Sequence, residues 1–136
     1  MQDTYQYDVI RYIASRYGGE AERPWVRAPA YIVFRHKENN RIYGILTSVP
    51  FSKLGGKSDL PIDVITLKVG DDLLRDMLIA QDGFYPGLGF GQRSWITVIL
   101  DGTVSFDDIK VFIDRSFSIT ATAKTRKAIS GGVQHE

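Results

Sequence analysis

The sequence predicts one α+β domain, in which helices pack against antiparallel strands. Two observations support this class: residues 30–49 have the pattern of two strands joined by a turn, and residues 62–117 alternate between strand-like and helix-like segments. A chain of 136 residues is long enough for one domain that buries about two thirds of its unfolded surface. We place this domain at 1–120 and expect residues 121–136, which are small, polar and basic, to form a flexible C-terminal tail.

Four segments have the composition of strands, rich in β-branched and aromatic residues. The first two are joined by Asn39 and Asn40, and asparagine tolerates the positive φ of a tight turn, so we expect a β-hairpin here. The aromatic, glycine-rich residues 84–91 are expected to form a loop. The predicted strands are 30–36, 41–49, 62–69 and 94–100.

Three segments, near 4–16, 71–79 and 105–118, have the apolar periodicity of amphipathic helices. The third begins with Ser105, followed three residues later by an aspartate, in the pattern of a capping box. In the last two helices, the side chains expected to face the core of the domain are Leu73, Leu74, Met77, Leu78, Ile109, Phe112, Ile113 and Phe117.

The composition excludes several classes of protein. There is no cysteine, which excludes disulfide scaffolds and thiolate metal sites. No apolar run is long enough to span a membrane, and the first residues lack the pattern of a signal peptide, so we expect a cytoplasmic protein without membrane contact. The two histidines, His36 and His135, are far apart, so no metal site is predicted, and His36 is expected to be a solvated strand residue.

Two glycine-rich segments match nucleotide-binding loops only in part. Residues 87–91 precede a strand, whereas a dinucleotide fingerprint precedes a helix. Residues 56–58 read Gly-Lys-Ser, but Phe51 stands where a phosphate loop needs glycine and Pro61 blocks the helix that should follow. We therefore expect no cofactor. Because His36 has no supporting nucleophile or acid motif, we predict a protein without catalytic activity.

Charge is divided unevenly along the chain. Residues 23–57 carry seven basic and one acidic side chain, whereas residues 58–122 carry five basic and ten acidic ones. Such segregation is typical of a surface that contacts nucleic acid, although solvated faces also show it. A basic hairpin and a basic loop would contact phosphates on one side of the fold, weakly and without sequence specificity. The candidate contacts are Arg35, His36, Lys37, Arg41, Lys53, Lys57 and Arg93.

An adaptor that binds a small ligand or a protein is the alternative function. Aromatic side chains interleaved with polar ones are typical of a ligand cleft. The candidate cleft residues are Trp25, Arg27, Tyr85, Phe90, Gln92 and Trp95.

Seven short segments, taken in order, resemble the MmcQ/YjbR family over residues 24–118. They are Pro24-Trp25, Val33-Phe34, Arg41-Ile42-Tyr43, Ile65-Thr66-Leu67-Lys68, Tyr85-Pro86-Gly87, Trp95-Ile96-Thr97-Val98 and Leu100-Asp101-Gly102. The resemblance implies a single antiparallel sheet backed by helices, similar to the frataxin-like fold, and nucleic-acid binding through two projecting wings. The chain departs from the family where members carry a His-x-Asn-Lys-Lys-His segment, since Gly89, Gly91, Gln92, Arg93 and Ser94 occupy those positions.

Overall fold

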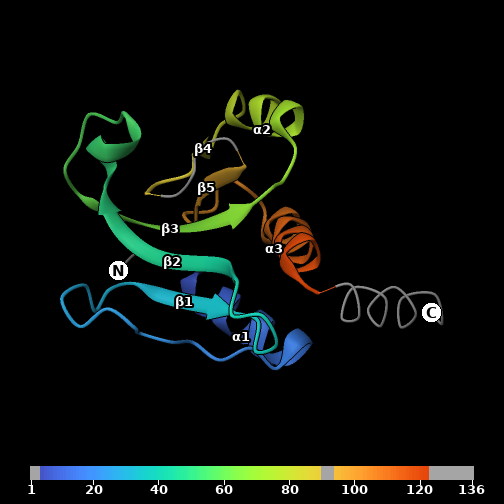
Figure 1. Ribbon diagram of the computed structural model, residues 1–136. Helices are drawn as coiled ribbons and strands as arrows, with labels where there is room; N and C mark the ends of the chain where they lie inside the picture. Colours follow the sequence, from blue (N-terminus) through green and yellow to red (C-terminus); the bar gives the residue numbers. More distant parts are fainter. Residues whose placement is uncertain (1–3, 90–93, 123–136) are drawn as a thin grey trace.

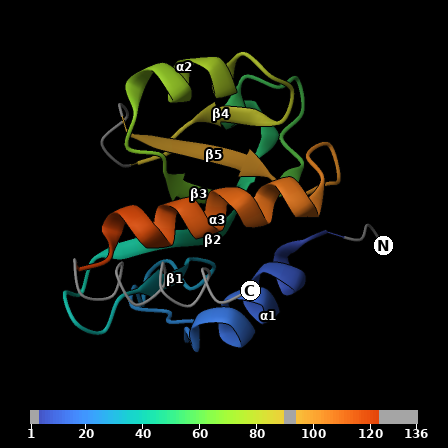
Figure 2. The same cartoon turned by 90° about the vertical axis from the view of Figure 1, so that its right-hand side faces the viewer.

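A computed structural model describes residues 4–89 and 94–122 of the chain (Figure 1). Its strands form one antiparallel sheet in the order β1-β2-β3-β5-β4, and its α-helices lie on one face of that sheet (Figure 2). This confirms the predicted α+β class. In chain order the elements are α1 (Gln6–Tyr17), β1 (Ile32–Arg35), β2 (Ile42–Pro50), the short 3-10 helix η1 (Phe51–Leu54), β3 (Pro61–Lys68), α2 (Asp72–Ile79), β4 (Phe84–Pro86), β5 (Trp95–Ile99) and α3 (Phe106–Thr120).

The predicted hairpin is confirmed as β1 and β2. Asn40 takes the left-handed backbone conformation, with φ of 62°, that the turn requires. Gly44 pairs with Phe34 and Ile42 pairs with Arg35, so β2 carries one extra residue, Tyr43, as a bulge.

The core lies between the sheet and the helices. Ile65 and Val98, from central strands, are fully buried there together with Ile113 of α3. Burying an isoleucine or valine side chain completely stabilises a fold by about 1.5–3 kcal/mol, so this layer supplies most of the apolar stabilisation. Ser116 of α3 ties the helix to the sheet: its hydroxyl donates to the carbonyl of Tyr43 at 2.6 Å and accepts from the N–H of Lys68 at 2.9 Å.

Side chains cap the starts of α2 and α3, at Asp71 and at the predicted Ser105. The Asp71 carboxylate accepts hydrogen bonds from the N–H groups of Leu73 and Leu74, and the Ser105 hydroxyl accepts from the N–H of Asp108 at 3.2 Å. None of the helices in the described part of the chain is long and apolar enough to cross a membrane.

Two of the predicted core residues of α2 are not buried. Leu73 is 71% exposed and Met77 is 58% exposed, whereas Leu78 is 5% exposed. The helix packs at the β4 edge of the sheet and contacts it along a narrow stripe, so the prediction was wrong for Leu73 and Met77. Phe112 of α3 is half-buried and packs edge-on against the ring of Phe84, 5.5 Å between centroids.

The segment at 84–86 was predicted as part of a loop, and it is a strand, β4. Phe84 pairs with Val98 and Pro86 pairs with Ile96. A three-residue strand followed by glycine has no local periodicity, so only its pairing with β5 reveals it.

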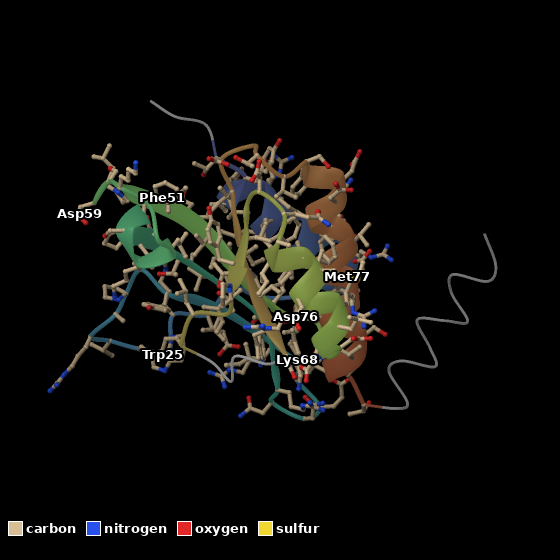
Figure 3. The ribbon with its side chains drawn as sticks, turned by 90° about the horizontal axis from the view of Figure 1, so that it is seen from above. Trp25, Phe51, Asp59, Lys68, Asp76 and Met77 are labelled. Atoms are coloured by element: carbon tan, nitrogen blue, oxygen red, sulfur yellow. The ribbon has the colours of Figure 1, made fainter. Side chains whose placement is uncertain are left out.

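The second face of the sheet is covered by loops and by η1. Val49, Val64 and Ile99 form a small buried cluster there, with Leu54 and Leu88 packed against it. On the same face the hydroxyls of Thr66 and Thr97 are hydrogen-bonded at 2.9 Å. Figure 3 places Phe51 and Trp25 on the side of the sheet away from α3, and Met77 on the side of α3.

Candidate functional site

The structure separates the predicted basic residues into two groups at opposite ends of β2. Lys37 and Arg41 lie at the hairpin tip before this strand, and Lys53 and Lys57 lie in and after η1 beyond its far end (Figure 1). Nine residues of extended chain span about 30 Å. The two groups, which the sequence hypothesis places on one side of the fold, are therefore separated by the length of β2. Arg93 lies outside the described residues.

His36 was predicted to be solvated, and the structure corrects this. The side chain is 3% exposed and its ring packs against Tyr43 and Phe117, at centroid distances of 4.9 and 4.4 Å. His36 comes directly after β1 and two residues after Phe34, whose side chain lies in the core on the face covered by α3. A buried imidazole cannot reach a phosphate group outside the protein.

The hydrogen bonds of His36 indicate which ring nitrogen carries its proton, and its burial determines its charge. The Thr120 hydroxyl donates to the carbonyl of Ser116 at 2.7 Å, so it accepts from Nε2–H of His36, 2.8 Å away. Burial lowers the pKa of His36. The imidazole is therefore neutral at pH 7, which makes it a structural group of the core.

Around the hairpin tip, acidic side chains accompany the basic ones. Arg35 is half-buried, and its Nε lies 3.5 Å from a carboxylate oxygen of Glu22. Lys37 and Arg41 are exposed, with Glu38 between them in the sequence. The tip thus carries mixed charge, which reduces its attraction for a polyanion.

The predicted aromatic cleft is divided between the two edges of the sheet. Trp25 precedes β1 and packs edge-on against Tyr31, 5.5 Å between ring centroids, while Arg27 is exposed in the same loop. Tyr85 and Trp95 lie on the adjacent strands β4 and β5, at and next to the other edge. Phe90 and Gln92 lie outside the described residues.

A cleft of about 390 Å³ lies at the β4 edge, between η1 and α2. Tyr85 and Leu88 form one wall, and Leu54 of η1 adds an apolar side chain. Lys53 reaches the cleft from η1, and Arg75 reaches it from α2. Of these residues, Lys53 and Tyr85 were predicted from the sequence, for different functions, and Arg75, Leu54 and Leu88 were not.

The turn after β4 is fixed by close packing and a buried hydrogen bond. A Cβ atom on Gly87 would lie 2.5 Å from the Cβ of Trp95 and 3.0 Å from its carbonyl carbon, so only glycine fits. The N–H of Leu88 donates to the Thr97 hydroxyl at 3.1 Å. These contacts hold the wall of the cleft in one position.

Two cationic side chains, Lys53 and Arg75, line the cleft. Nη1 of Arg75 lies 3.0 Å from the Asp76 carboxylate, whereas Nε of Arg75 is buried and has no hydrogen-bond partner among the described residues. An unpaired buried donor costs about 1–3 kcal/mol, which an acceptor on a ligand would relieve. Burial, followed by the charges of Asp101 and Asp82, which do not line this cleft, raises the pKa of Tyr85, so its hydroxyl remains a donor.

The chain is similar to proteins from several bacteria. The uncharacterised protein YyaQ of Bacillus subtilis is 29% identical over 113 residues, which cover 83% of this chain and 95% of YyaQ. A Pseudomonas syringae protein has a crystal structure with a TM-score of 0.82 and 34% identity, covering 85% of this chain and 98% of that one.

Two further comparisons agree with the fold and the family. Protein DR2400 of Deinococcus radiodurans has the same fold, with a TM-score of 0.67 and 19% identity, covering 96% of this chain and 92% of that one. The YjbR family model matches residues 14–119, which include the sheet and most of the helical layer. The chain belongs to the YjbR family.

Proposed function

We propose that this protein is a non-catalytic binding module that takes a small organic anion into the cleft between η1, α2 and β4. One observation carries the proposal: Lys53 and Arg75 converge on an apolar-walled cleft that no acidic side chain of the described residues lines. Opposed cationic groups on apolar walls are the arrangement that binds a carboxylate or phosphate attached to an apolar body.

The size and chemistry of the cleft define the class of ligand. A volume of about 390 Å³ suits a single-ring acid. The guanidinium of Arg75 supplies the unpaired Nε–H, and Lys53 supplies a mobile ammonium group. Tyr85 and Leu88 offer apolar surface for the body of the ligand.

The test is a calorimetric titration with three probes of similar shape: phenyl phosphate, benzoate and neutral benzamide. Phenyl phosphate is expected to bind most tightly and benzamide least. Lys53→Ala and Arg75→Gln should each weaken phenyl phosphate binding by about tenfold, which corresponds to about 1.4 kcal/mol. Lys57→Ala is the matched control, because Lys57 is exposed in the same loop and does not line the cleft. Equal binding of benzamide, or equal losses in all three variants, would refute the proposal.

As a second candidate we propose weak binding of nucleic acid at the hairpin tip, which the exposure of Lys37 and Arg41 favours. Affinity would come from phosphate contacts, each contributing about 0.7–0.9 to the slope of log affinity against log salt. The test is fluorescence anisotropy with duplex and single-stranded DNA at two salt concentrations, using Lys37→Glu/Arg41→Glu. Binding that this double variant does not weaken would count against the hairpin, and the cleft variants test the first candidate separately.

A further inference from the structure

A second cavity, of about 310 Å³, lies at the far end of β2 from the anion cleft, where α1 ends against the hairpin and α3. Its aromatic part is formed by Tyr17, Tyr43 and Phe117. The rings of Tyr17 and Phe117 are stacked, with centroids 3.7 Å apart and 8° between planes, and Tyr43 meets Phe117 edge-on at 4.8 Å. These rings form an aromatic floor of the cavity.

Carboxylates outnumber cations around this floor. Glu20, Glu22 and Glu38 line the cavity, opposed by Arg35 and Lys37. With the buried His36 neutral, the lining residues carry a formal charge of −1. The side chain of Arg35 is engaged by Glu22 at 3.5 Å, which leaves Lys37 as the only other cation on the described lining.

The end of α1 adds to the negative potential. The N–H groups of Gly18 and Gly19 donate back to the carbonyls of Ala14 and Ile13, so the helix ends at the cavity. The C-terminal end of a helix carries a partial negative charge that favours cations. A Cβ on Gly19 would lie 2.4 Å from the Tyr43 hydroxyl oxygen, so glycine lets this helix end lie directly over the aromatic floor.

The charge of Glu22 also acts on the floor of the cavity. Burial, followed by the charge of Glu22, raises the pKa of Tyr43 to about 12. The negative charge of Glu22 stabilises the neutral phenol of Tyr43, and the same charge would attract a positively charged ligand to the cavity.

We propose that this cavity binds an organic cation, a primary ammonium or guanidinium group on a short apolar chain. The cationic end would pair with the Glu20 and Glu38 carboxylates near the end of α1, and the chain would lie on the rings of Tyr17 and Phe117. This site is independent of the anion cleft, because it has the opposite charge preference and lies at the other end of β2.

The experiment is an NMR titration of the full chain with three probes of matched length: butylammonium, 1-butanol and butyrate. Butylammonium is expected to give saturable shifts of the Gly18, Gly19 and Lys37 amides, and the other two probes much weaker ones. Glu20→Gln/Glu38→Gln should weaken butylammonium binding by about tenfold or more, as two carboxylates are lost. The control is Asp8→Asn, at the first turn of α1 and away from the cavity, which removes one acidic charge and therefore matches the single variant Glu20→Gln in charge.

The outcomes separate clearly. Unchanged affinity in Asp8→Asn with a loss in the double variant supports the site. Binding of 1-butanol as tight as that of butylammonium, equal losses in Asp8→Asn and the double variant, or no saturable shift at all would each overturn it. If the double variant does not fold, Glu20→Gln alone replaces it in the titration, and its affinity for butylammonium should fall by a smaller factor.

Discussion

The imidazole of His36 lies 2.8 Å from the hydroxyl of Thr120, and this contact joins the turn of the β-hairpin to the last turn of α3. The side-chain amide of Asn39 adds a second link by donating to the carbonyl of Thr120 at 2.9 Å. Two residues separated by most of the chain length thus hold the end of the helix against the sheet.

Because His36 is buried, acidification should destabilise the fold. Burial holds its pKa below the usual 6.5, an effect that Arg41 reinforces and that Glu38 and the Phe117 carbonyl oppose. The native state therefore binds fewer protons than the unfolded state, so the free energy of unfolding falls as the pH drops below about 6.5. This group contributes at most about 1.4 kcal/mol per pH unit. Urea melts at pH 7.5 and 5.5 should show a smaller change for His36→Gln than for the wild type, and an equal change would contradict the assignment.

Thr120→Val should show how much the hydrogen bond between His36 and Thr120 contributes to stability at neutral pH. The substitution keeps the shape of the side chain but removes the acceptor for Nε2–H of His36, leaving a buried donor unpaired. The expected loss is about 1–3 kcal/mol in the free energy of unfolding, measured by urea denaturation. Ser15→Ala, on the exposed side of α1, should change stability by no more than about 0.5 kcal/mol.

The two faces of α2 can be compared with one type of substitution. Leu78→Ala removes a side chain that is 5% exposed and should cost about 2–5 kcal/mol. Leu73→Ala removes one that is 71% exposed and should stay within about 0.5 kcal/mol. Denaturant melts of both variants measure the free energy of unfolding, and similar losses in the two variants would mean that α2 buries a wider face.

Gly87→Ala should disturb the wall of the anion cleft. Its new methyl group would lie 2.5 Å from the Cβ of Trp95, so the turn has to move, at a cost of about 1–3 kcal/mol. Gly44→Ala is the control, since the nearest side-chain atoms to its Cβ lie at 3.7 Å, an ordinary contact. Thermal melts and phenyl phosphate titrations should show losses for Gly87→Ala alone, and a normal response from both variants would contradict a tight fit at Gly87.

Local signals were sufficient to predict the hairpin, the cap at Ser105, and the order of the longer elements. Each of these depends on residues close together in the sequence, where turn chemistry and periodicity act directly. Strand β4 could not be found in this way, because its three residues are defined by pairing with β5.

The candidate site was harder to predict than the fold. Lys53 and Lys57 both lie in the basic segment after β2, and nothing in the sequence distinguishes them. Only Lys53 lines the cleft, because its position depends on how η1 packs near α2. Arg75 has the sequence signature of an exposed helix residue, and its burial arises from tertiary packing alone. For His36 a signal was present, in its spacing of two from Phe34, and it predicts the buried position correctly.

Both margins of the sheet are protected against the addition of a further strand. On the outer side of β1, the N–H and carbonyl of Val33 are already bonded to Glu22 at 2.8 and 3.0 Å. At the opposite margin, the edge strand β4 is only three residues long and ends at Pro86, which has no backbone N–H to donate. An extended segment of another chain therefore finds few open donors and acceptors at either margin, and the fold resists edge-to-edge aggregation without needing a long charged strand.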